Sequence, residues 1–207
     1  MLEKEKYSVS FTAGALLLSE TERVIDYLIN GTLEESKKEL IANNKIQINS
    51  ESSRERVLNE LVKRTKYVDK TIWNEFVRSS SQEKKILLLY VCYKTYKLML
   101  DFASEEILNK WRTRNTKLFG DEVEYFLHKK SEIHPEINQW TEKTRKKAVQ
   151  VILHILSEVG LLINNTITPL EANDKFWTIF IKLGDPWFLE LALLNKQQRD
   201  KIYELVK

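Results

Sequence analysis

Apolar residues recur along most of this chain at the three- and four-residue spacing that is typical of amphipathic α-helices. Short polar breaks separate the runs, and Asn30-Gly31, Asn43-Asn44 and Ser79-Ser80-Ser81 are the clearest of them. Helices are predicted at 11–30 (a hairpin or bent helix), 32–43, 50–68, 69–78, 82–102, 104–115, 120–130, 141–160, 169–183, 185–194 and 197–206. The segment 82–102 is apolar all round, which predicts a buried central helix.

One stretch departs from the helical pattern. The sequence LLINNTITPL, which follows Gly160, has strand character and is long enough only for a small β-hairpin near 161–168. The pattern therefore predicts an all-α fold, a compact multi-helix bundle with at most this hairpin. The serine triplet divides it into an N-terminal helical region, 1–80, and a C-terminal region, 81–207, which we expect to pack as one compact body.

Composition agrees with this fold and bounds the function. The chain has 207 residues, of which 43% are hydrophobic and 30% charged, an ordinary globular balance. Only five glycines and three prolines occur, which are few turn-forming residues for a protein built of strands and tight turns. The net charge of +3 is mildly basic, so a case for nucleic-acid binding depends on where the basic residues cluster.

The location of the protein follows from cysteine usage and apolar run length. The single cysteine, Cys92, excludes an internal disulfide and fits a reducing compartment. The N-terminal segment MLEKEKYSVSF lacks the apolar core of a signal peptide. The most apolar run, 86–93, is far shorter than the ~20 residues of a membrane span. The sequence predicts a cytoplasmic protein without a membrane helix.

Enzyme signatures are missing from the chain. It contains no glycine-rich phosphate loop, G-x-S-x-G elbow or dinucleotide fingerprint. His128, His134 and His154 show neither the i, i+4 spacing nor the cysteine partners of a metal site. We therefore expect a non-enzymatic protein with no cofactor and no metal.

Two predicted helix starts share a pattern. The first is SESSRERV (50–57) and the second is TEKTRKKA (141–148), and both read hydroxyl, Glu, any, hydroxyl, Arg, any, basic, small apolar. The N-terminus of a helix attracts phosphate, and hydroxyls and arginines in its first turns reach phosphates or base edges. The repeat predicts two helix-turn-helix-like units, 32–66 and 121–160. The alternative interpretation is that both are the solvated basic faces of ordinary helices.

The DNA-facing residues follow from these units and from a third basic stretch around Trp111, whose ring is a stacking or a core side chain. The predicted DNA-binding residues are Ser53, Arg54, Arg56, Lys63, Arg64, Arg112, Arg114, Lys143, Thr144, Arg145, Lys146 and Lys147. The helix that ends at Gly160 and precedes a hairpin is an arrangement also found in winged-helix domains, where the wing touches the DNA backbone or minor groove.

Three segments together resemble the BrxA family of BREX (bacteriophage exclusion) defence systems: FTAGALLLSETERV (11–24), SESSRERVLNELVKR (50–64) and WTEKTRKKAVQVILHILSEVGLL (140–162). The resemblance covers roughly 7–165. It implies a NusB-like all-helical fold with helix-turn-helix elements, and double-stranded DNA binding beside a BREX methyltransferase, ATPase and phosphatase-like component. Ser53 stands where the family pattern has Thr, and Glu55 adds an acid between Arg54 and Arg56.

Three functions are left open by the sequence. The first is a non-enzymatic, double-stranded DNA-binding accessory component of a BREX system. The second is a protein–protein adaptor in the BREX complex without direct nucleic-acid contact. The third is RNA binding in the NusB manner, which follows from fold analogy alone.

Overall fold

The computed structural model describes residues 6–207, so the first five residues of the predicted region 1–80 lie outside the described residues. The described chain forms two compact units. The N-terminal unit is Ser10–Thr95, and the C-terminal unit combines residues 6–9 with Tyr96–Lys207. The predicted division after residue 80 lies before the central helix α6 (Ser81–Thr95), whereas the units divide after it. The reason is that α6 packs against helices α1, α4 and α5 of the N-terminal unit.

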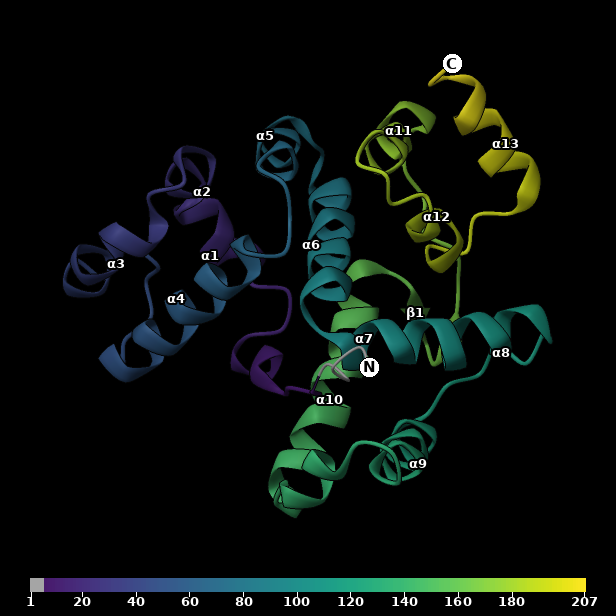
Figure 1. Cartoon of the computed structure of the whole chain (residues 1–207), viewed down its shortest axis with the longest axis horizontal. Helices are drawn as coiled ribbons and strands as arrows, with labels where there is room; N and C mark the ends of the chain where they lie inside the picture. Colours follow the sequence, from purple (N-terminus) through teal and green to yellow (C-terminus); the bar gives the residue numbers. More distant parts are fainter. Residues whose placement is uncertain (1–5) are drawn as a thin grey trace. The chain divides into compact units, whose positions relative to one another are not determined.

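The N-terminal unit consists of short helices around α4 and α6 (Figure 1). Its elements are a 3₁₀ turn (Ser10–Ala13), α1 (Leu18–Arg23), α2 (Ile25–Asn30), α3 (Leu33–Ala42), α4 (Glu51–Thr65), α5 (Thr71–Arg78) and α6. Helix α3 packs against α4, and α2 packs against α5. Gly31 ends α2 with φ +74°, a left-handed conformation that glycine adopts without steric cost.

The all-round apolar pattern of the central helix is confirmed, because α6 is buried from Ile86 to Tyr93, with Cys92 among the enclosed residues. The predicted end of this helix was wrong. Tyr96 has an extended backbone (φ −121°, ψ 103°) and ends the helix. A new helical segment begins at Lys97 and continues through Ser104, where a separate helix was predicted to start. The Ser104 hydroxyl donates to the carbonyl of Asp101 (3.2 Å), a local bond within a helix that takes the place of an N-cap.

The C-terminal unit contains the remaining helices and a small sheet. Its elements are α7 (Lys97–Phe102), a π-helical turn (Ala103–Ile107), α8 (Leu108–Arg112), α9 (Gly120–Ser131), a 3₁₀ turn (Pro135–Gln139), α10 (Glu142–Val159), β1 (Leu162–Ile163), β2 (Thr166–Ile167), α11 (Asp174–Lys182), α12 (Trp187–Leu191) and α13 (Lys196–Glu204). Helix α10 packs against α9 and β1, and α11 packs against α13. The all-α prediction is confirmed.

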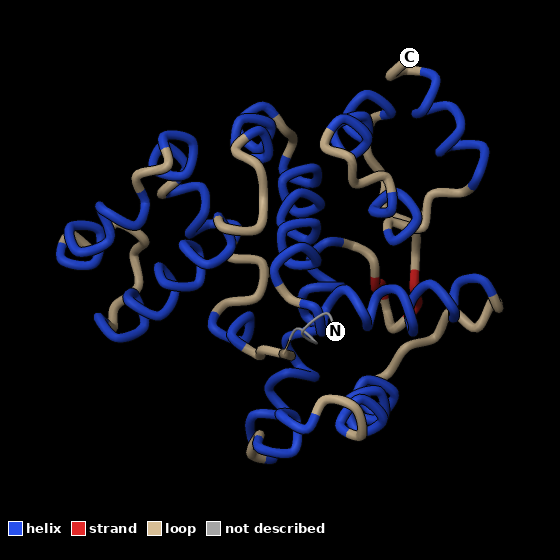
Figure 2. Tube along the Cα trace, in the orientation of Figure 1, coloured by secondary structure: helices blue, strands red, loops and turns tan. Residues whose placement is uncertain are grey.

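The predicted hairpin is also confirmed, as the two short strands drawn in red in Figure 2. Asn164 and Asn165 form its two-residue turn, and both have positive φ (50° and 58°), the combination that a type I′ hairpin turn requires. Thr116 and Leu118 add a third segment, because the N–H of Ile167 donates to Thr116 O (2.7 Å) and the N–H of Leu118 donates to Asn165 O (3.0 Å). The hairpin is therefore fixed to the segment that precedes α9.

Residues 6–9 are held in the C-terminal unit by Tyr7, which is 4% exposed. Its ring stacks on His134 with 3.8 Å between ring centroids, and its hydroxyl donates to Asp101 Oδ2 (2.5 Å). Its N–H donates to Glu136 Oε1 (2.6 Å). Burial and the bond to Asp101 raise the pKa of the Tyr7 hydroxyl, so it is a neutral donor at physiological pH.

Candidate nucleic-acid interface

Helix α10 has a well-defined start. The hydroxyl of Thr141 accepts a hydrogen bond from the N–H of Thr144 (3.1 Å), as an N-cap residue does. Arg145 reaches back from the first turn and donates to the carbonyl of Ile137 (3.1 Å), which ties the helix to the 3₁₀ turn before it. Gly120 at the start of α9 lies against Val149 and Leu153 of α10. These contacts fix the direction in which the first turns of α10 point.

The outward face of those turns carries the densest group of basic residues on α10. We call Lys143, Lys146, Lys147 and Gln150 the α10 face; all four are exposed and line one shallow groove with Glu142. Lys146 forms an i, i+4 ion pair with Glu142 (2.5 Å), which raises the pKa of the lysine and lowers the pKa of the carboxyl. The three lysines stand on the first turns of the helix, where the helix dipole also attracts anions.

The elements around α10 follow one another in the order that winged-helix domains use. Helix α8 is followed by the strand-like segment at Lys117, then by α9, α10 and the β1–β2 hairpin. Lys117 pairs with Thr166 across the sheet, and its ammonium donates to the Thr166 hydroxyl (2.8 Å). The hairpin tip, Asn164-Asn165, is exposed. This part of the C-terminal unit thus consists of three helices and a small sheet that the segment at Lys117 joins.

The matching arginine in the N-terminal unit has the same structural task as Arg145. Arg54 Nη1 donates to the carbonyls of Ile48 and Asn49 (2.9 and 3.0 Å), in the link that precedes α4. Ser53 is half-buried beside it. Both repeated arginines therefore hold the backbone before their helices, and in this unit only Arg56 of the predicted first-turn residues is fully exposed.

The other two basic residues predicted on α4 donate hydrogen bonds to the segment that precedes α1. Arg64 is 0% exposed, and its guanidinium donates to the carbonyls of Leu16 (2.7 Å) and Ala15 (2.5 Å). Lys63 is half-buried and donates to the Ser10 hydroxyl (2.8 Å). These side chains hold the N-terminal segment of the unit onto α4; Arg64 is enclosed, whereas Lys63 still lines an open groove with Arg56.

The third basic stretch is divided between surface and interior. Arg112 is exposed and forms an ion pair with Glu190 (2.7 Å), and Arg114 is exposed with φ 60°. Lys110, by contrast, is 8% exposed and bonds to Glu122 and to the carbonyl of Lys117. Partial burial acts to raise the pKa of Glu122, but hydrogen bonds from Lys110 and the N–H of Phe119 lower it. This pair anchors the start of α9.

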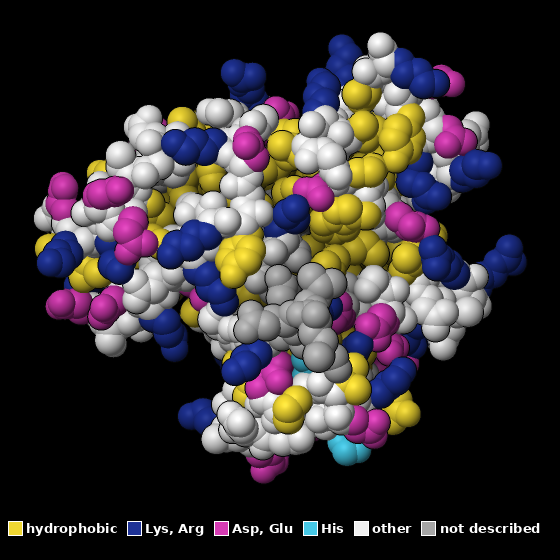
Figure 3. Space-filling view, in the orientation of Figure 1, with side chains coloured by type: hydrophobic (Ala, Val, Ile, Leu, Met, Phe, Trp, Pro, Cys, Tyr) yellow, Lys and Arg dark blue, Asp and Glu magenta, His cyan; other side chains and the backbone are white. Residues whose placement is uncertain are grey.

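The structure brings together the predicted residues of the second unit and separates those of the first by burial. Thr144 and Arg145 support the start of α10, and Lys143, Lys146 and Lys147 form its open face. Sequence reasoning missed Gln150, although its position seven residues after Lys143 places it on the same side of a helix. Elsewhere charges of both signs alternate, as on the face drawn in Figure 3.

Residues 6–207 contain no group of three or more His, Cys, Asp or Glu side chains placed to hold a metal ion. Within the same residues, every helix is too short or too polar to cross a membrane.

Comparisons with known proteins match most of the chain. The BrxA family model matches residues 5–179. A relative described as "BREX protein BrxA", from Bacillus cereus (strain H3081.97), is 27% identical over 165 residues, which are 79% of this chain and 82% of the relative. A crystal structure of an uncharacterized protein from Magnetospirillum magneticum superposes with a TM-score of 0.72 at 16% identity, covering 91% of this chain and 98% of that one. At this identity the structural likeness shows a shared fold alone.

Proposed function

The chain belongs to the BrxA family of BREX phage-defence components, and from that premise we propose that it is a cytoplasmic, non-enzymatic protein that binds double-stranded DNA. The observation that carries this proposal is the α10 face, three exposed lysines and a glutamine on the first turns of a capped helix. In the proposed role the protein works beside the methyltransferase, ATPase and phosphatase-like components of the system.

Each residue of the α10 face has a separate task in the proposed complex. Lys143 and Lys147 neutralise phosphates on one strand, because a lysine ammonium on a flexible stem follows the backbone without reading sequence. Gln150 lies one turn further along and offers an amide to base edges in the major groove. Lys146 must exchange its pairing with Glu142 for a phosphate, so its contribution is smaller.

The hairpin supports the same placement. In a winged-helix protein the wing lies on the DNA beside the recognition helix, and here the exposed Asn164-Asn165 tip supplies two amides for sugar or phosphate oxygens. The bond from Lys117 to Thr166 and the backbone bonds to Thr116 and Leu118 hold the hairpin in place. A rigid wing adds contacts without the entropy cost of ordering a loop.

The proposal predicts weak, salt-sensitive and sequence-tolerant binding. A few phosphate contacts give dissociation constants on the order of micromolar, which rise steeply with salt because counterions are released. We would measure fluorescence anisotropy of a labelled ~30-base-pair duplex at two salt concentrations with the full chain. Lys143→Gln/Lys147→Gln should weaken binding about tenfold and reduce the salt slope by about two.

The matched control is Lys175→Gln/Lys196→Gln, which removes the same charge from exposed positions on α11 and α13. Equal losses in both double variants would contradict the assignment to α10. An absence of binding at low salt would contradict DNA binding itself and favour the adaptor function, whereas stronger competition by RNA than by duplex DNA would favour the NusB-like alternative.

A further inference from the structure

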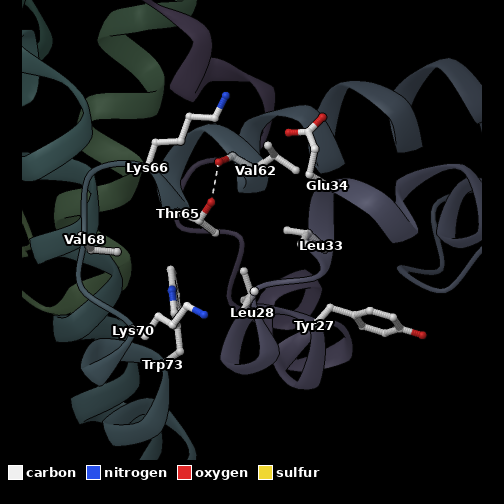
Figure 4. Close-up of a pocket in the computed structure, with 11 residues that line it drawn as sticks. Tyr27, Leu28, Leu33, Glu34, Val62, Thr65, Lys66, Val68, Lys70 and Trp73 are labelled. Carbon is white, nitrogen blue, oxygen red and sulfur yellow. Dashed lines mark hydrogen bonds between the residues drawn. The ribbon is translucent and has the colours of Figure 1, made fainter.

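The N-terminal unit contains a pocket that the proposed DNA-binding surface does not use. It has a volume of about 550 Å³ and lies between the α2–α3 turn, the end of α4 and the start of α5 (Figure 4). This volume is within the usual range of small-molecule sites. The pocket lies wholly within the Ser10–Thr95 unit, so its geometry depends on that unit alone.

The pocket walls are mainly aliphatic. Leu28 and Leu33 contribute from the two sides of the α2–α3 turn, Val62 from α4, and Val68 from the loop before α5. Gly31 forms part of the same rim, where its left-handed backbone leaves room for the Lys70 side chain; a Cβ there would lie 2.8 Å from Lys70 Nζ. An apolar group of a ligand would fit against these walls.

The polar groups of the pocket are mostly hydrogen-bond donors. In Figure 4, Lys70 is drawn with Trp73 at one end of the pocket, and its ammonium group points toward the other lining residues. Lys66 lies at the opposite rim. Trp73 is 2% exposed and lines the pocket, and its indole N–H is a further donor there. Thr65 already uses its proton on the carbonyl of Val62 (2.7 Å).

A ligand with acceptor oxygens can form a charge-assisted hydrogen bond with Lys70 and a second hydrogen bond with the indole N–H of Trp73. Glu34, at the outer rim, is the one carboxylate among the lining residues, against the two lysines. The balance of charge and donors therefore selects a ligand with a negative charge and acceptor oxygens. The aliphatic walls select an apolar body for it.

We propose that this pocket binds a small organic anion, a carboxylate or phosphate ester carried on a compact apolar group. Its acidic oxygens accept from Lys70 Nζ and from the Trp73 indole N–H, and its apolar group lies against Leu28, Leu33 and Val62. The site stands in the unit that does not carry the α10 face, so the inference is independent of DNA binding.

The test is an NMR titration of the ¹⁵N-labelled full chain. The five tryptophans give five indole N–H resonances, and Trp73→Phe assigns the one of interest; if that variant does not fold, assignment through bonded nuclei replaces it. The probes are phenyl phosphate and phenylacetate, with 2-phenylethanol as the neutral analogue. The proposal predicts a saturable shift of the Trp73 indole with at least one acid and a much weaker response to the alcohol.

Variants on the exposed lysines test the site without touching its core. Lys70→Gln should weaken acid binding about tenfold, since it removes the charged partner, and Lys38→Gln, on the exposed face of α3, should leave binding unchanged. The proposal is overturned if neither acid moves the Trp73 resonance at about 10 mM, a concentration at which even millimolar sites fill. It is equally overturned if the alcohol binds as well as the acids, or if Lys38→Gln matches Lys70→Gln.

Discussion

Helices α4 and α10 begin with the same sequence pattern and present different surfaces. In both, an arginine in the first turn donates to carbonyls of the preceding link, Arg54 to Ile48 and Asn49, and Arg145 to Ile137. After that point they diverge. Helix α10 exposes three lysines on one face, whereas α4 turns Arg64 into the core and bonds Lys63 to Ser10.

The difference shows that a count of basic residues on a helix does not give the number of charged groups that reach solvent. Arginine is a residue of choice for capturing backbone carbonyls, because its guanidinium offers several donors in a rigid fork. Lysine in the same position keeps its charge in water on a flexible stem. The repeated arginine therefore marks how the two helices are attached, and the exposed lysines on either side of Arg145 distinguish the candidate binding helix.

The largest effect is expected at Arg64. Replacement by Met keeps much of the side-chain volume but leaves the buried carbonyls of Ala15 and Leu16 without a donor. We expect the free energy of unfolding to fall by roughly 2–5 kcal/mol, measured by urea denaturation. DNA affinity of the folded protein should not change.

Arg56→Met is the matched control, because Arg56 lies on the same helix and is exposed. Its stability should stay within about 0.5 kcal/mol of the parent. A large loss of DNA affinity in folded Arg64→Met would show that the comparison between the helices is mistaken.

Replacing Arg54 or Arg145 should lower the free energy of unfolding by similar amounts, which are smaller than the loss expected at Arg64. Arg54→Ala and Arg145→Ala each remove hydrogen bonds from a charged donor to partly buried carbonyls, which should cost about 1–2 kcal/mol. Thermal or urea unfolding of the two variants measures the cost. If one variant is destabilised and the other is not, the two arginines do not contribute equally to holding the segment before their helix.

The smallest effect on stability is expected at Glu136 in the C-terminal unit, and it depends on pH. Burial acts to raise the pKa of Glu136, but hydrogen bonds from the N–H of Tyr7, from its own N–H and from His134 lower it below 4.5. A lowered carboxyl pKa stabilises the fold above the unfolded value, and this contribution is lost as pH falls through the folded value. Glu136→Gln should therefore cost up to about 1 kcal/mol at pH 7.

The stability difference between Glu136→Gln and the parent should shrink as the pH falls through the lowered pKa of Glu136, because the carboxyl then gains its proton. Urea unfolding at pH 7 and at pH 3.5 makes the comparison, with exposed Glu132→Gln as the control. A difference that grows on acidification would contradict this account of Glu136.

Much of the fold was predictable because helical periodicity and caps are local. The cap at Thr141, the helix end at Gly160 and the hairpin near 161–168 are each recognised from a few neighbouring residues, and each is found where predicted. The helix end before Tyr96 was not predictable, because nothing in YKTYKLML (93–100) resembles a turn. Ser104 and the acids after it resemble a helix start, yet the chain there continues as a π-helical turn because its apolar neighbours are packed in the core.

The candidate site was predictable only in part, because burial depends on contacts between distant residues. Arg64 and Lys147 look alike in sequence, but Arg64 is enclosed by a segment 48 residues earlier in the chain. The pocket around Trp73 has no sequence signature, since its walls come from α2, α3, α4 and α5. The lysines of α10 were found because they sit next to their own cap.

The anchoring of Tyr7 also sets an order of events during synthesis. Its N–H bonds to a carboxylate 129 residues later, so Tyr7 leaves the ribosome long before its partner exists. Ser10–Thr95 can fold in that interval, while the segment ahead of it waits for His134 and Glu136 to emerge. Tyr7 can therefore take its place in the C-terminal unit only after His134 and Glu136 have been synthesised.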